Sequence, residues 1–282
     1  MPWKRDKLFC DINPTCYAVS VQKEICKRHI KNFLDKDVFA KTIIKEELPN
    51  VVFSHSSNMI KRAEGINLQH QINKAVNIKL ASSKISGMII RPGEVFSFWK
   101  AVGKISKKKG YMEGRILHRK KLTYGLGGGL CNLANTIHLL ILHSPLEIIE
   151  IHKHSDALAP DEGKRIPFSS GTSIVYNNID YRFKNNTDQN VQLFLWCEGE
   201  ILYAELRSEK EFPWCYKLIE ENHHFKKEQD KYYRISKIYK ETYNKEGSGE
   251  TAADILEKEL VWDNRSEVLY DYALIPEDQI RE

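Results

Sequence analysis

The 282-residue sequence contains no apolar run long enough to cross a lipid bilayer. Its first ten residues, MPWKRDKLFC, are basic but include neither an apolar stretch nor the small residues that precede a signal-peptide cleavage site. We therefore expect no signal peptide, no transmembrane segment and a cytoplasmic location. A peripheral position at the inner face of the membrane is compatible with these absences.

The sequence also lacks the compact patterns that mark disulfide frameworks, metal sites and nucleotide sites. Its six cysteines are scattered, and no CxxC or HExxH pattern occurs. The glycine-rich stretch at 125–130 lacks the last glycine of a GxGxxG motif and the Lys-Ser/Thr of a P-loop. We expect reduced thiols, no metal and no cofactor. Anion binding at the start of a helix stays open.

Basic residues are concentrated in one segment, although the formal net charge is only +5. Between residues 100 and 121 there is one acid, Glu113, and there are nine basic residues: Lys100, Lys104, Lys107, Lys108, Lys109, Arg115, Arg119, Lys120 and Lys121. This segment predicts either an anion-attracting rim beside the glycine stretch or a pair of solvated hairpin tips. It is too weak a signal to indicate a nucleic acid partner, and we expect none.

Hydrophobic periodicity predicts an α+β fold with three regions. Residues 1–85 show helical spacing and predict an N-terminal helical region. Residues 86–208 predict a core domain in which a mostly antiparallel sheet packs on the helix that follows the glycine stretch; strand-like alternation over 172–208 predicts a meander. Residues 209–282 predict a β-rich C-terminal extension.

The glycines at 127–129 permit a sharp turn directly before an apolar run with helical spacing. This places Cys131 in the first helical turn, where backbone N–H groups and the helix dipole favour a thiolate. His152 and His154 share one face of a following strand, so that either is a candidate base, and Asp156 is a candidate orienting residue. The alternative is that Cys131 is a small buried residue at a helix–sheet contact.

Five segments, in their order and spacing, resemble the VanW family: RPGEVFSFW at 91–99, GYMEG at 110–114, GGGLC at 127–131, HS at 154–155 and FKNNT at 183–187. The likeness is densest from about residue 85 to residue 207. The flanking regions look like the short form of this family, which accompanies vancomycin-resistance operons.

The resemblance implies a bacterial protein linked to glycopeptide resistance or to the cell envelope. It also implies that the glycine stretch, Cys131 and His154 are signature positions. Asn132 stands where the family usually has glutamine, which shortens the reach of the side-chain amide by one methylene. The family's biochemistry is unsettled, so the resemblance implies no reaction and no oligomeric state.

Two hypotheses follow, together with a weaker third in which Cys131 is a redox or regulatory thiol. In the first, an accessory protein binds an anionic cell-wall precursor or another envelope component at the glycine stretch. In the second, an enzyme uses Cys131 to attack an amide or ester of a peptidoglycan precursor, with His154 as the base. The expected ligand-binding residues are Gly127, Gly128, Gly129, Asn132, Phe96, Trp99, Tyr111, Lys107, Lys108 and Lys109.

Overall fold

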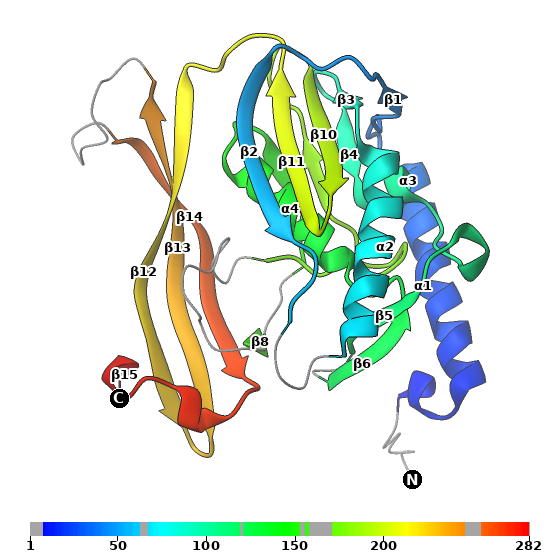
Figure 1. The fold of residues 1–282 in the computed structure, drawn as a ribbon, viewed down its shortest axis with the longest axis vertical. Coiled ribbons are helices and arrows are strands. Elements are labelled where there is room, and N and C mark those ends of the chain that lie inside the picture. The colour runs from blue at the N-terminus through cyan, green and yellow to red at the C-terminus, as the bar shows by residue number, and fades with distance from the viewer. Residues whose placement is uncertain are drawn as a thin grey trace.

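The computed structural model describes residues 8–62, 67–118, 121–152, 156–157, 171–245 and 255–281. It confirms the predicted α+β fold (Figure 1). No helix in these ranges is both long and apolar enough to cross a membrane. The helices and 3-10 turns are η1 (Phe9–Asp11), α1 (Pro14–Leu34), α2 (Leu68–Ile85), α3 (Phe98–Val102), η2 (Lys107–Lys109), α4 (Leu130–Leu142), η4 (Tyr272–Leu274) and η5 (Glu277–Gln279).

Local capping explains where the two long N-terminal helices begin. Asn13 precedes α1, and its side chain accepts a hydrogen bond from the Cys16 N–H at 2.8 Å. Pro14 then occupies the first helical position, where its missing N–H costs no intrahelical hydrogen bond. Asn67 caps α2 in the same way, because its side chain accepts hydrogen bonds from the N–H groups of the second and third residues of the helix.

A five-stranded antiparallel sheet forms the centre of the molecule. Its strands lie in the order β1 (Thr42–Ile43), β3 (Met88–Ile90), β10 (Val191–Glu198), β11 (Ile201–Ser208) and β2 (Asn50–Asn58). Helix α2 packs against β10, and α4 packs against β2 and β11. The first 85 residues therefore supply two strands of this sheet as well as helices. The sheet and both helices enclose the main hydrophobic core.

A second, three-stranded sheet has the order β4 (Val95–Ser97), β9 (Arg182–Lys184) and β7 (Glu147–Glu150). The predicted meander over 172–208 is therefore wrong in part, because β10 and β11 form a hairpin but β9 belongs to this other sheet. The physical reason is Asn185, which is fully buried after β9. Its side-chain amide donates to the backbone carbonyls of Ile90 at 2.8 Å and Gln189 at 2.9 Å, which turns the chain between the two sheets.

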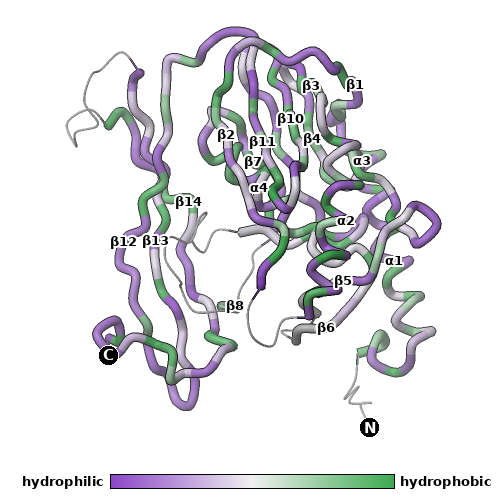
Figure 2. The backbone as a smooth tube through the Cα atoms, in the orientation of Figure 1, coloured by the Kyte–Doolittle hydropathy of each residue, from purple (hydrophilic) through white to green (hydrophobic). Residues whose placement is uncertain are grey.

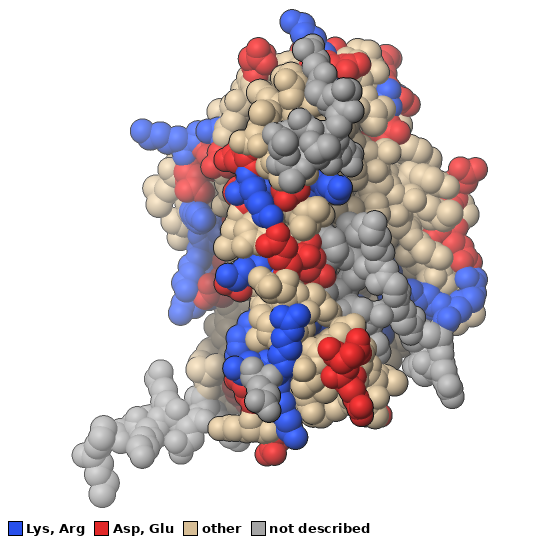
Figure 3. Space-filling view, turned by 90° about the vertical axis from the view of Figure 1, so that its left-hand side faces the viewer, with Lys and Arg blue, Asp and Glu red and all other residues tan. Residues whose placement is uncertain are grey.

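The C-terminal region forms a long sheet beside the central one, in which the three main strands pair antiparallel and a short strand pairs parallel at each edge (Figure 1). It contains β12 (Trp214–Glu228), β13 (Lys231–Asn244) and β14 (Ile255–Val268), with the two-residue strands β15 (Ile280–Arg281) and β8 (Asp156–Ala157) at its edges. Acidic and basic side chains are interspersed on the side of the molecule that this sheet forms (Figure 3). The predicted β-rich C-terminal part of the fold is confirmed.

Candidate functional site

The candidate site lies where a β-hairpin leads into α4. Strands β5 (Glu113–His118) and β6 (Lys121–Leu126) pair antiparallel, and residues 127–129 then turn into the helix. Gly129, the N-cap of α4, has a φ of +97°, in the left-handed region that favours glycine. A Cβ atom on Gly128 would lie 2.1 Å from the carbonyl carbon of Gly114, so two backbone segments touch here. The turn requires glycine for both reasons.

Asn77 of α2 fixes this glycine loop in place. Its side chain is fully buried, and its Nδ2 donates to the carbonyls of Met112 at 3.0 Å and Gly128 at 2.9 Å. Its Oδ1 accepts from the Met112 N–H at 2.8 Å. One amide therefore satisfies three backbone groups of the loop and its approach. Asn77 is not among the residues predicted from the sequence, where its only signal is a polar residue among the apolar positions of a helix.

Cys131 is the second residue of α4, as the sequence predicted for the first helical turn. Its side chain packs against the main core, and its Sγ lies 3.9 Å from the carbonyl oxygen of Ile174. Burial raises the pKa of the Cys131 thiol, which is opposite to the effect expected from the helix dipole alone. The described surroundings therefore hold Cys131 as a neutral thiol, and a thiolate here requires a base.

The chain following residue 171 connects α4 to His152. The Thr172 N–H donates to the Asn135 side-chain oxygen of α4 at 2.6 Å, and the Ser173 N–H donates to the His152 carbonyl at 2.7 Å. The next residue in this segment is Ile174, the partner of Cys131. Cys131 and His152 therefore contact the same short segment.

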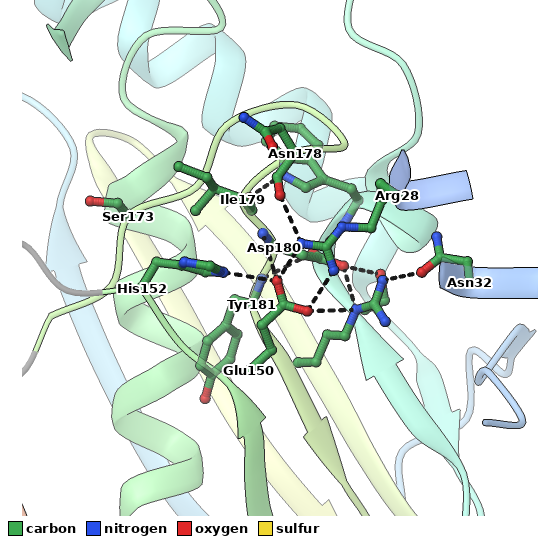
Figure 4. Close-up of polar contacts among 12 residues, drawn as sticks. Arg28, Asn32, Glu150, His152, Ser173, Asn178, Ile179, Asp180 and Tyr181 are labelled. Atoms are coloured by element: carbon green, nitrogen blue, oxygen red, sulfur yellow. Dashed lines mark hydrogen bonds and ion pairs between the residues drawn. The ribbon is translucent and has the colours of Figure 1, made fainter. Parts of the chain in front are cut away.

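His152 has an acidic partner. Its Nε2 lies 2.9 Å from a carboxylate oxygen of Glu150, and its side chain is 39% exposed (Figure 4). Both carboxylate oxygens of Glu150 also accept hydrogen bonds of 2.6 Å from Arg28 of α1. Burial alone raises the pKa of Glu150, but the hydrogen bonds from Arg28 and His152 outweigh it and lower that pKa to about 2. Glu150 is thus ionised and orients the imidazole.

His154 lies outside the described residues, so the predicted pair of Cys131 and His154 stays a prediction. Asp156 is the first residue of β8, where its backbone pairs with Glu267, but its side chain lies outside the described part. In the described ranges, no group of three or more His, Cys, Asp or Glu side chains is arranged to hold a metal ion.

A lysine that the sequence analysis did not single out lies against the loop. The aliphatic stem of Lys74 in α2 packs on Gly129, so closely that a Cβ atom there would lie 2.2 Å from the Lys74 Cγ. Burial, together with the positive charges of Lys61 and Arg115, lowers the pKa of Lys74 to about 8. The stem of a partly buried lysine therefore packs on the N-cap of α4, and two further cations act on its ammonium group.

Asn132 follows Cys131 in α4, and its side chain reaches strand β2. Its Nδ2 lies 3.3 Å from the hydroxyl oxygen of Ser57 in β2. Its Oδ1 is buried, and no described residue donates a hydrogen bond to it. A buried acceptor without a donor is costly, so this oxygen is suited to a ligand donor or to a water molecule.

The aromatic residues expected to line a pocket lie in the core instead. Phe96, Trp99 and Tyr111 are at most 5% exposed. Phe96 stacks on Phe183 with ring centroids 4.9 Å apart, and the Trp99 ring nitrogen donates to the Ile179 carbonyl at 2.9 Å. These side chains stabilise the sheets that carry the site and do not face an open pocket.

The three lysines of η2 are exposed at the edge of the loop region. Lys107 forms an ion pair of 2.9 Å with Glu113, and the Lys109 ammonium donates to the Lys104 carbonyl at 2.8 Å. Their segment reaches the glycine loop through Ile105, whose side chain would lie 2.6 Å from a Cβ atom on Gly127. The basic segment therefore flanks the loop.

Residues 73–207 match the VanW family, described as VanW like protein. Over 249 residues, or 88% of each chain, the sequence is 28% identical to Vancomycin B-type resistance protein VanW of Enterococcus faecalis. Over 119 residues, or 42% of this chain and 38% of the relative, it is 26% identical to the uncharacterized protein YoaR of Bacillus subtilis. No solved structure matches the chain. The resemblance predicted from the motifs is confirmed.

Proposed function

This chain carries a VanW-like domain at residues 73–207, and from that premise we propose that it acts in glycopeptide resistance by binding an anionic cell-wall precursor at the glycine loop. The full-length similarity to a vancomycin resistance protein supports the resistance role. The geometry of the loop supports the binding role. The proposal places the protein at cytoplasmic stages of wall synthesis, where precursors carry a pyrophosphate.

The environment of the Lys74 ammonium group is the observation that carries the proposal. Its ammonium group is partly buried, and the charged groups that act on it among the described residues are the cations Lys61 and Arg115. Bringing like charges together at the positive end of a helix costs free energy in the absence of an anion. A phosphate or carboxylate group offsets this cost, because it accepts a charge-assisted hydrogen bond from the lysine and its negative charge is favoured by the helix dipole.

The experiment measures binding of inorganic pyrophosphate and of a soluble nucleotide-linked peptidoglycan precursor by titration calorimetry. We expect Lys74→Gln to weaken binding of both ligands by about tenfold or more, since it removes one charge-assisted hydrogen bond. Lys79→Gln is the matched control, because Lys79 is an exposed lysine on the same helix. Equal affinity in the wild type and in Lys74→Gln contradicts the proposed site.

The alternative function is a cysteine enzyme that cleaves an amide or ester of a peptidoglycan precursor. It is favoured by the segment at 172–174, which contacts both Cys131 and the backbone of His152. The Cys131 Sγ would attack the carbonyl carbon, while a histidine takes the thiol proton and returns it to the leaving group. Incubation of labelled precursor with wild type and Cys131→Ala tests this function: product formed only by the wild type supports it, and no difference excludes it.

A further inference from the structure

Helix α1 makes polar contacts with the protein through one of its faces. Arg28 reaches Glu150 with two hydrogen bonds of 2.6 Å and the Asn178 carbonyl with one of 2.7 Å (Figure 4). Asn32, one turn further on, accepts a hydrogen bond of 2.5 Å from Arg182. Both side chains lie on the same side of the helix, since they are four residues apart. Polar contacts of high geometric specificity therefore fix the orientation of α1.

The opposite side of α1 carries an apolar stripe that faces solvent. The outer stripe consists of Val19, Cys26, Ile30 and Phe33, whose spacings of seven, four and three residues place them on one helix face. Val19 is 53% exposed, Ile30 is 60% exposed and Phe33 is 89% exposed. No residue of α1 is buried, although hydrophobic and hydrophilic positions alternate along it (Figure 2). An ordinary surface helix turns its apolar side chains inward. In α1 the half-buried Val21 and Ile25 lie on the inward side, but the outer stripe faces solvent.

A row of lysines runs beside the outer stripe. The lysine row consists of Lys23, Lys27 and Lys31, each four residues from the next, so that they share one helix edge. All three are exposed, and only one ion pair, from Lys27 to Glu24 at 2.8 Å, is found among them and the described residues. Leu34, which is 71% exposed, lies at the boundary between the row and the stripe.

We infer that the protein binds to an anionic lipid bilayer through the outer face of α1. An apolar helix face with lysines along its edge is the arrangement of helices that lie in the plane of a membrane interface. The outer stripe would enter the acyl boundary, while the lysine row contacts the anionic headgroups. The polar attachment of the opposite face then holds the folded domain above the membrane.

A lipid surface fits this face better than a second copy of the chain. In a two-fold symmetric dimer with antiparallel α1 helices packed through the outer stripe, the two lysine rows would lie on the same side of the contact and repel each other. The stripe is also only one side chain wide along a helix of about 32 Å, which is narrow against the roughly 800 Å² that each partner buries in a stable complex. An anionic bilayer instead can bury a narrow apolar stripe, and its headgroups attract the positive charge of the lysine row.

The test is co-sedimentation of the full chain with vesicles of phosphatidylcholine alone and of phosphatidylcholine with phosphatidylglycerol. We expect binding to the vesicles that contain phosphatidylglycerol. Phe33→Glu should lower the partition coefficient by about tenfold, because the side chain loses its burial and repels the headgroups. Leu256→Glu is the matched control, since it makes a similar change at a side chain that is 59% exposed on β14.

Three results would overturn the inference. The first is no wild-type binding to anionic vesicles, and the second is equal binding by Phe33→Glu and the wild type. The third is a dimer in light scattering that Phe33→Glu dissociates, without vesicle binding, which assigns the face to a second copy. The inference is independent of the glycine loop, so Lys74→Gln should bind vesicles normally; loss of binding in that variant alone would place the lipid contact at the loop.

Discussion

Glu150 shows how one side chain is set by residues far apart in the sequence. Arg28 lies 122 residues before it, yet the pair forms two hydrogen bonds, and the Glu150 side chain is only 12% exposed. Because a charge of this kind is costly to bury alone, removal of either partner leaves an uncompensated ion. The ion pair therefore couples α1 to the strand that leads into His152.

Glu150→Gln should destabilise the protein by about 2 to 4 kcal/mol at pH 7 in urea unfolding. The folded pKa of Glu150, about 2, lies below its ordinary value of 4.5, so its stabilisation is present above about pH 4.5 and is lost as the pH falls through 2. The difference between variant and wild type should shrink over that range. Glu200→Gln is the control, because the Arg62–Glu200 pair has similar geometry but is exposed. An equal loss in both variants contradicts the assignment.

Cys131 should alkylate slowly. The partly buried thiol has a raised pKa, so at pH 7.5 we expect its reaction with iodoacetamide to be about tenfold or more slower than that of the exposed Cys26. Each cysteine lies alone in its tryptic peptide, 122–153 and 24–27, so mass spectrometry can follow both in one sample. Reaction of Cys131 as fast as Cys26, and slowed by His152→Ala, would favour the enzyme instead.

At the scale of elements, the locally encoded parts of the fold were predictable. The helix after the glycines begins at Leu130, directly after the glycine turn, as its apolar spacing indicated. Strand β4 ends at Ser97 although the largely apolar run continues to Trp99, because the Ser97 hydroxyl accepts from the Lys100 N–H at 3.2 Å and starts α3.

Contacts between distant elements were not predictable, for a physical reason. Asn77 and Gly128 are 51 residues apart. Local periodicity in the sequence does not show that the Asn77 amide in one helix contacts the glycine loop that precedes another helix. Lys74 is a similar case. In the sequence it is an ordinary helix lysine, and only the structure shows that its aliphatic stem packs against Gly129. The glycine loop was therefore predictable from the sequence, but Asn77, which holds the loop in place, and Lys74, which brings a positive charge to it, were not.

Asn77→Ala should loosen the glycine loop while α2 itself stays helical. The change removes three hydrogen bonds and takes away the Asn77 partner of the Met112 N–H and of the buried Gly128 carbonyl, while the Met112 carbonyl still accepts from the Gly127 N–H, so we expect a loss of about 2 to 4 kcal/mol. Hydrogen exchange of the amides at 125–131 should become faster than in the wild type. Unchanged exchange at these amides would show that the loop holds its conformation without Asn77.

On the scale of the whole molecule, two hydrophobic cores are distinct. The main core runs in sequence from Ala40 to Phe212, whereas a small second core of Ala157, Phe225, Val268 and Ile275 belongs to the C-terminal sheet. One contact between the two parts is the Lys240 ammonium, which donates to the Ser144 carbonyl at 2.6 Å. We propose that the residues after 208 form an extension of an independently stable core domain.

A chain that ends after Pro213 should therefore keep a cooperative urea transition and its affinity for pyrophosphate. It retains the main core through Phe212 and every residue of the glycine loop, Lys74 included. Circular dichroism during urea titration, together with calorimetry, measures both properties. Loss of cooperative unfolding would mean that the C-terminal sheet is an integral part of the core domain.

The most direct measurement of anion binding at the glycine loop is pyrophosphate affinity as a function of pH in the wild type and in Lys74→Arg. The pKa of Lys74, about 8, lies well below that of an arginine, while titration of the ligand is the same for both proteins. From pH 7 to pH 10, wild-type affinity should fall by about tenfold relative to Lys74→Arg, as the wild type loses its ammonium charge. A constant ratio of the two affinities across this range would contradict binding at Lys74.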